Sequence, residues 1–459
     1  MTNFWDFEAW GSYNLFSVLL ASLLVASLVK KWVPFLKASL IPNSVLGGGM
    51  LILVAGIYKG ITGNILFDTA FFGGKGTANL ELLTYHCLAL GFIAGTLKSS
   101  NTKLTKKRTV EIFNTGVTTV STYLLQGVLG MGISMLAALV VKAFFPAAGI
   151  LLPFGYGQGT GQALNYGTIF ENDFGFEGGK SFGLTVAALG FLSASIGGVI
   201  HLTFLKRKGV ITGHADTEPG LRSEQIQVEG ESPMQESVDK MTIQIALIGV
   251  SYMLAYLLMM GLGALLPGMR SVIFGFNFLL GVLAATLVKL ALNTMRKTGM
   301  IRRIHVNDFL MTRASNFFYD LMVVAGIAAI RLSALEQYWG IILIMGVVGM
   351  VATYIYNYYV AKLLFPEYVQ AQFLTMYGML TGTASTGVIL LREIDGDFKT
   401  PASDNMVYQN FPAIVFGFPL MLLATLAPKK PVMTFLILIG FLLVMNVILF
   451  RSFIFKKKK

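Results

Sequence analysis

The chain has 459 residues, of which 55% are hydrophobic and only 13% are charged, and this composition excludes a soluble globular protein of this length. Its formal net charge of +12 comes from basic residues that cluster in short segments between apolar runs. Anionic lipid headgroups are the natural partners of such segments, so we do not expect nucleic acid as a partner. The single cysteine, Cys87, excludes an intramolecular disulfide and a multi-cysteine metal cluster.

Apolar runs long enough to cross a membrane recur along the whole chain. Residues 1–11 include acidic side chains where a secretory signal peptide needs a basic segment, so the first run is expected to remain as a span. A spanning helix needs about 20 predominantly apolar residues. On that basis we predict spans at 12–29, 43–61, 82–97, 113–145, 181–205, 241–266, 271–292, 315–332, 337–363, 404–427 and 432–454. The predicted fold class is an all-α polytopic membrane protein.

Basic side chains follow the first, third, fifth, seventh and eleventh predicted spans. They are Lys30, Lys31, Lys37, Lys98, Lys103, Lys106, Lys107, Arg108, Lys206, Arg207, Lys208, Arg296, Lys297, Arg302, Arg303 and Lys456 to Lys459. Because cytoplasmic loops carry an excess of Lys and Arg, these segments and the C-terminus are predicted to be cytoplasmic, with the N-terminus outside. Lys429 and Lys430 fall on the outer face and are the exception.

Two stretches interrupt this pattern because they are rich in glycine and polar side chains. They read LLPFGYGQGTGQALNYG at 151–167 and YGMLTGTASTG at 377–387. Each interior Gly costs a helix about 1 kcal/mol relative to Ala. Unwound backbone at membrane depth survives only where protein or water satisfies its amide groups. We interpret 147–172 and 370–391 as re-entrant hairpins, which in transporters mark the binding site.

A hydrophilic segment, 206–240, divides the chain into halves of similar pattern. We predict that it is a cytoplasmic linker between an N-terminal repeat of five spans at 1–205 and a C-terminal repeat of five spans at 241–427. An odd number of spans in each half inverts the second repeat relative to the first. The two hairpins are therefore expected to enter from opposite faces and to meet near the midplane. Residues 428–459 add an extra span and a basic cytoplasmic tail.

Both hairpins offer groups that suit a small anionic substrate. Free N–H groups at the start of a half-helix bind a carboxylate, and amide and hydroxyl side chains add donors. The candidate substrate-binding residues are Gly157, Gln158, Gly159, Thr160, Gly161, Gln162, Asn165, Thr381, Gly382, Thr383, Ser385 and Thr386. The alternative for such small and polar residues is a close helix–helix crossing.

Oxygen atoms in and near the hairpins suit a Na⁺ ion. The candidate Na⁺ ligands are Tyr156, Gln126, Asp320, Ala384, Gly387, Asp404 and Asn405. An intramembrane carboxylate such as Asp320 is costly and suggests a function, although it can also be protonated or lie near water. Asp404 and Asn405 open the predicted span 404–427, where capping the helix is the first explanation and a contribution to the site the second.

Three amide side chains lie within other predicted spans: Gln126, Asn277 and Asn357. Each can line a polar pathway, and each can instead form an interhelical hydrogen bond. The sequence leaves both roles open.

Signatures of an enzyme are absent from the sequence. The four histidines, His86, His201, His214 and His305, are scattered, and no His-Glu-x-x-His motif occurs. The chain also lacks the phosphate-binding Gly-x-x-x-x-Gly-Lys-[Ser/Thr] motif. We therefore do not predict an enzyme.

Several motifs resemble those of the glutamate:sodium symporter family of bacteria. The first is IPNSVLGGG at 41–49, and the second is GQGTGQA at 157–163, which is similar to that family's first glycine-rich re-entrant motif. Phe182-Gly183-Leu184 and Gly197-Gly198 also fit, and Thr381 to Gly387 falls where the family has its second hairpin. This chain departs from the family in lacking a glycine pair in the second hairpin and in having an extra final span.

The resemblance implies Na⁺-coupled uptake of glutamate or a similar small anion by two inverted repeats. It also implies a homodimer in the bacterial cytoplasmic membrane that moves by an elevator-like mechanism. The alternative within transport is a Na⁺- or H⁺-coupled carrier of another organic anion, such as a hydroxycarboxylate or dicarboxylate. A channel and a sensor of such a solute are the alternatives outside transport.

Overall fold

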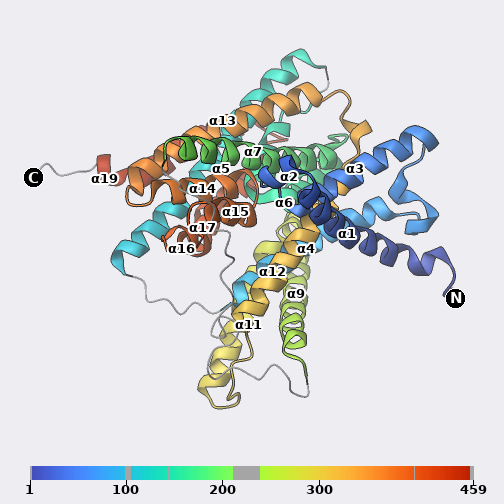
Figure 1. Ribbon diagram of the computed structural model, residues 1–459, viewed down its shortest axis with the longest axis horizontal. Helices are drawn as coiled ribbons and strands as arrows, with labels where there is room; N and C mark the ends of the chain where they lie inside the picture. The colour runs from blue at the N-terminus through green and yellow to red at the C-terminus, as the bar shows by residue number, and fades with distance from the viewer. Residues whose placement is uncertain (1–2, 99–104, 143, 210–237, 397–398, 455–459) are drawn as a thin grey trace, which may run out of the picture. The chain divides into compact units, whose positions relative to one another are not determined.

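The structure is a computed structural model that describes residues 3–98, 105–142, 144–209, 238–396 and 399–454. The regular elements of these segments are helices (Figure 1). The long apolar ones are α1 (Phe7–Trp32), α3 (Asn43–Thr62), α4 (Gly76–Leu97), α5 (Lys106–Val140), α7 (Gly179–Arg207), α9 (Lys240–Leu265), α11 (Asn277–Lys297), α13 (Trp339–Leu364) and α18 (Pro431–Leu449). These nine helices of the described segments are long and apolar enough to cross a membrane. The chain is thus a helical polytopic membrane protein, as its composition predicts.

The remaining helices are shorter, broken or more polar. They are α2 (Pro34–Ala38), α6 (Leu151–Phe174), α10 (Arg270–Gly275), α12 (Asp308–Ala328), α14 (Val369–Thr381), α15 (Ala384–Arg392), α16 (Ala402–Tyr408), α17 (Asn410–Leu426) and α19 (Arg451–Ile454). Single-turn 3₁₀ helices lie at Leu66–Asp68, Ala70–Phe72, Ala148–Ile150, Pro267–Met269 and Leu332–Leu335.

Three predicted spans differ from the helices observed. The span at 315–332 corresponds to α12, which is not among the apolar candidates because it carries charged residues such as Arg313 and Asp320. The span at 404–427 is not one straight helix, because α16 and α17 meet at an angle of 50°. The span at 271–292 is divided at Phe276, between α10 and α11.

The chain forms two compact units. Unit 1 comprises Met1–Leu20, Phe67–Lys103 and Thr217–Gly326, and unit 2 comprises Ala21–Leu66, Leu104–Asp216 and Ile327–Lys459. Each unit combines segments from before and after the predicted linker. The division of the chain into repeats at 1–205 and 241–427 stays a prediction. Most of the predicted linker, residues 210–237, lies outside the described residues.

Unit 1 contains α4, α9, α11 and α12. Its buried apolar core includes Ile93, Ile248, Ala285 and Met311, one from each of the four helices. Small residues allow close packing here, because a Cβ at Gly91 would overlap the ring of Tyr319. Unit 1 is therefore a bundle with an ordinary apolar core.

Unit 2 has a more polar interior, and α5 and α7 lie at its centre. Both helices contact α13 and α14 (Figure 1). One face of α5 is lined by buried polar side chains at three- and four-residue spacing. They are Thr115, Thr118, Thr119, Thr122 and Gln126, and all are at most 1% exposed. A polar stripe of this kind inside a membrane helix must be satisfied by neighbouring polar groups, and the second hairpin supplies two of these, Gln372 and the carbonyl of Leu380.

Candidate functional site

Helix α6 folds back on itself at Gly159. The ring of Phe154 stacks on that of Tyr166 with centroids 4.1 Å apart, whereas twelve residues span about 18 Å in a straight helix. Gly159 has φ 77° and ψ −170°, a conformation that is essentially restricted to glycine. Residues before and after it are helical. The stretch predicted as the first hairpin is therefore a helical hairpin, with Gly159 at its tip.

Helices α14 and α15 form a second helical hairpin, whose tip is Gly382 and Thr383. Here the two arms are packed backbone to backbone. A Cβ at Gly378 would lie 2.8 Å from the Cα of Gly387, and one at Gly387 would lie 2.6 Å from the carbonyl oxygen of Thr375. Glycine at these positions is what allows the α14–α15 arms to approach so closely.

The two hairpins run along α5 from opposite ends. The first hairpin begins beside Gly130 of α5, which lies so close to Gly149 that a Cβ on Gly149 would overlap its backbone. The tip of this hairpin reaches Tyr123, whose hydroxyl donates to the Gly157 carbonyl at 3.0 Å. The second hairpin begins near Thr115, whose hydroxyl accepts from Gln372 at 3.1 Å. It reaches Gln126, whose Nε2 donates to the carbonyl of Leu380 at 2.9 Å. Both tips thus lie beside the middle of α5.

The same convergence is seen along α7. Gly167 of the first hairpin packs against Gly179, near the start of α7, while Gln370 of the second hairpin contacts His201, near its end. Both tips arrive at Gly190, where a Cβ would collide with the carbonyl oxygen of Thr381 and press against the ring of Tyr156. The absence of a side chain at Gly190 allows the tips to come together.

Two tyrosines tie the hairpins to one residue of α7, Ser193. The Tyr156 hydroxyl lies 2.9 Å from Ser193 Oγ and also donates to the Gly346 carbonyl at 2.6 Å. The Tyr377 hydroxyl donates to the Ser193 carbonyl at 2.8 Å. Both tyrosines are fully buried. Ser193 therefore joins the two hairpins, because its hydroxyl donates to Tyr156 and its carbonyl accepts from Tyr377.

The predicted substrate-binding residues all lie at or near these two tips, and their exposure differs. Thr160, Gln162, Asn165, Thr381 and Thr386 are buried, whereas Gln158, Thr383 and Ser385 are partly exposed. The accessible polar groups are therefore concentrated at the start of α15. The N-cap residue of α15 is Thr383, and its side chain does not accept a hydrogen bond from the first amides of the helix.

Gln126 is a predicted Na⁺ ligand on α5 that bonds to the second hairpin. Its Nε2 donates to Thr353 Oγ1 and to the Leu380 carbonyl, both at 2.9 Å. Its Oε1 is buried and has no hydrogen-bond partner. An unsatisfied buried acceptor costs roughly 1–3 kcal/mol, so such an oxygen suggests a ligand or a water molecule.

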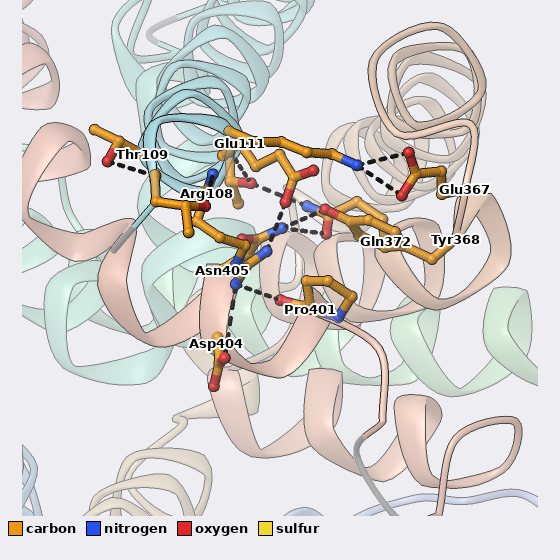
Figure 2. Close-up of polar contacts among 12 residues, drawn as sticks. Arg108, Thr109, Glu111, Glu367, Tyr368, Gln372, Pro401, Asp404 and Asn405 are labelled. Atoms are coloured by element: carbon orange, nitrogen blue, oxygen red, sulfur yellow. Dashed lines mark hydrogen bonds and ion pairs between the residues drawn. The ribbon is translucent and has the colours of Figure 1, made fainter. Parts of the chain in front are cut away.

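A polar network holds the base of the second hairpin to the start of α5 (Figure 2). Arg108 contacts Glu111 at 2.6 Å and Asp404 at 3.6 Å. Asn405 donates to the Tyr368 hydroxyl at 2.9 Å and to Gln372 Oε1 at 3.2 Å (Figure 2). Burial raises the pKa of the Tyr368 phenol, which keeps it protonated. The segments before α14 and after α15 are thus both bonded within one network.

Two of the predicted Na⁺ ligands have other roles in this network. Asp404 has an exposed side chain that pairs with Arg108, and Asn405 is buried beneath it. Neither residue caps α16, because that helix begins at Ala402 and its N-cap is Pro401. The capping interpretation is therefore wrong for both.

The other predicted Na⁺ ligands are divided between the two units. Tyr156, Ala384 and Gly387 belong to the hairpins of unit 2. Asp320 lies on α12 in unit 1, where its side chain is exposed.

Several residues of the site were not among the predicted ligands, notably Tyr123, Ser193, Tyr377 and Gln409. Gln409 lies at the bend between α16 and α17 and accepts from Thr119 at 2.9 Å. One signal was available in the sequence, the run NTGVTTVST at 114–122, which is unusually polar for a membrane span.

Comparison of the chain with protein-family models and with curated proteins finds no match.

Proposed function

We propose that this protein is a Na⁺-coupled symporter that imports glutamate or a similar small anionic substrate by alternating access. The observation that carries the proposal is the meeting of two helical hairpins, entering unit 2 from opposite ends, at Gly190. Broken helices whose ends meet in the interior of a membrane protein are the usual architecture of a transporter binding site. Inverted repeats with two re-entrant hairpins account for the opposite directions of entry.

The substrate site would lie at the two hairpin tips. Each tip is the start of a helical arm, at Thr160 in the first hairpin and at Ala384 in the second. The first amides of a helix have no intrahelical acceptor, and the helix dipole adds partial positive charge there. These amides would bind the carboxylates of the substrate, and the hydroxyls of Thr383 and Ser385 would add hydrogen bonds.

Na⁺ would bind to neutral oxygens beside the tips, with Gln126 as the first candidate. Substrate and Na⁺ together would satisfy the polar groups of both tips, which then permits the movement that exposes the site to the other side. In this proposal the protein is a carrier and not an enzyme. It lies in a bacterial cytoplasmic membrane with its C-terminus inside, and its partners are membrane lipid and a second copy of itself in a homodimer.

Uptake by the purified protein in liposomes tests the proposal. An inward Na⁺ gradient should drive accumulation of labelled glutamate above the external concentration, and replacing Na⁺ by K⁺ should abolish it. Competition by unlabelled amino acids, hydroxycarboxylates and dicarboxylates identifies the preferred anion. Accumulation that persists without Na⁺ contradicts sodium coupling, and unitary currents without uphill accumulation indicate a channel.

A further inference from the structure

Four buried side chains form a ring between α5 and α13. Gln126 donates to Thr353 Oγ1 at 2.9 Å, and Asn357 donates to Thr122 Oγ1 at 3.3 Å and to the Thr353 carbonyl at 3.0 Å. Thr122 and Gln126 are one helical turn apart on α5, and Thr353 and Asn357 are one turn apart on α13. All four are at most 1% exposed. The ring is therefore sealed inside unit 2.

The orientation of both amides is fixed by their acceptors. The Nε2 of Gln126 faces the Leu380 carbonyl, and the Nδ2 of Asn357 faces the Thr353 carbonyl. A carbonyl oxygen only accepts hydrogen bonds, so the NH₂ group of each amide must point toward it. The opposite ends of the two amides, Gln126 Oε1 and Asn357 Oδ1, are buried acceptors without a hydrogen-bond partner.

The oxygens of this ring suit a cation of low charge. Each threonine hydroxyl accepts one hydrogen bond and has a second lone pair, which adds to the two amide oxygens. None of the four side chains is ionisable, and the described residues contain no group of three or more His, Cys, Asp or Glu that could hold a metal ion. Calcium and magnesium sites generally include carboxylates, so neutral oxygens favour an alkali ion.

We propose that Gln126, Asn357, Thr122 and Thr353 form a Na⁺ site between α5 and α13. The inference rests on the proposed function in treating this Na⁺ as the coupling ion. The same Gln126 amide that offers Oε1 to the ion donates from Nε2 to Leu380, the third residue before Thr383 at the second tip. Na⁺ bound at Oε1 adds to the hydrogen bonds that orient this amide and thereby stabilises the second hairpin in the position that binds substrate.

The test uses the full-length protein in detergent, with no substrate present. Thermal unfolding is followed while NaCl replaces choline chloride at constant ionic strength, with KCl in a parallel series. A ligand that binds only the native state stabilises it by RT ln(1 + [L]/Kd), so the unfolding temperature keeps rising with the logarithm of the ligand concentration above the Kd. We expect this logarithmic rise with Na⁺ and none with K⁺. A rise that is equal for both cations overturns the proposal. No rise with either cation also overturns it, and this is the result expected if water satisfies the two oxygens.

Variants locate the effect. Gln126→Ala and Asn357→Ala each remove one ligand oxygen. The Na⁺ concentration at which the unfolding temperature begins to rise, which is set by the Kd and is called the Na⁺ midpoint, should increase about tenfold or more. Asn277→Ala is the matched control, because Asn277 is also buried with an unpartnered Oδ1 but lies on α11 in unit 1. It should lower the unfolding temperature without moving the Na⁺ midpoint. An unchanged midpoint in the Gln126 and Asn357 variants contradicts the site.

Asn357→Asp keeps the test decisive if the alanine variants do not fold. It preserves the size of the side chain and adds a carboxylate, so Na⁺ should bind more tightly at high pH and more weakly as the carboxylate is protonated. A Na⁺ midpoint independent of pH in this variant counts against the site. The unfolding test uses no substrate, so its outcome is independent of the uptake assay. Na⁺ binding at this site without glutamate uptake in liposomes would refute the proposed substrate and leave the Na⁺ site standing. Sodium-driven uptake with unchanged midpoints in the variants would refute this site alone.

Discussion

Replacing Gly159 by alanine tests whether the first hairpin needs its observed tip. At φ 77° and ψ −170° the backbone of Gly159 is in a region that costs an L-residue about 1–3 kcal/mol. Gly132→Ala is the matched control, because Gly132 lies within α5 and a Cβ there would meet only the ring of Phe435 at 3.8 Å. Alanine in a helix interior stabilises by about 0.5–1 kcal/mol relative to glycine. The two variants should therefore differ in opposite directions from the natural protein.

The magnitude is large enough to measure by thermal unfolding in detergent. The summed difference between the variants is roughly 1.5–4 kcal/mol. A change of 1 kcal/mol moves the midpoint of a 150–250-residue domain by about 2–4 °C, so a gap on the order of 5 °C is expected. Glutamate uptake should fall in Gly159→Ala and be retained in Gly132→Ala. Equal unfolding temperatures would show that the chain does not turn at Gly159 as described.

Three further substitutions probe the contacts around the tips. Gly190→Ala should lower the uptake rate and destabilise the protein by about 1–3 kcal/mol, because its Cβ would collide with both tips, and a fully active variant would refute the convergence at this residue. Tyr377→Phe should lower the free energy of unfolding by about 1 kcal/mol through loss of the bond to Ser193, which thermal unfolding measures against the natural protein. Arg108→Ala removes the contacts to Asp404 and to the Pro401 carbonyl, so proteolysis of the segment after α15 should accelerate, and an unchanged cleavage rate would contradict the role of Arg108 in holding this segment.

The membrane-spanning pattern was predictable because the bilayer demands long apolar helices, and most of the predicted spans coincide with helices observed. Failures occur where polar residues enter a helix. Arg313 and Asp320 make α12 too polar for a typical span, although its apolar half suggested one. The bend between α16 and α17 has a local cause, since Pro412 has no N–H to donate to the carbonyl of Tyr408, the last residue of α16.

The hairpins were also predictable in position, because glycine-rich polar sequence inside an apolar chain has few other stable solutions in a bilayer. Their partners were not predictable. Ser193 and Tyr377 are ordinary residues for membrane helices, and only the fold brings them within 2.8 Å of each other. The compact units were not predictable either, because each draws on both halves of the chain.

The proposed coupling of substrate to Na⁺ rests on the positions of backbone amides and side-chain oxygens that lack hydrogen-bond partners within the protein. A helical hairpin that ends inside a protein leaves unbonded amides at its tip, and a nearby orphan oxygen adds a site of opposite character. In unit 2 the start of α15 provides the amides, and Gln126 provides the oxygen. An anion alone would satisfy the amides and leave the oxygens of Gln126 and Asn357 unpaired, while a cation alone would do the reverse. Under the proposed function, simultaneous binding satisfies both, so a movement that requires a satisfied interior would carry anion and cation together.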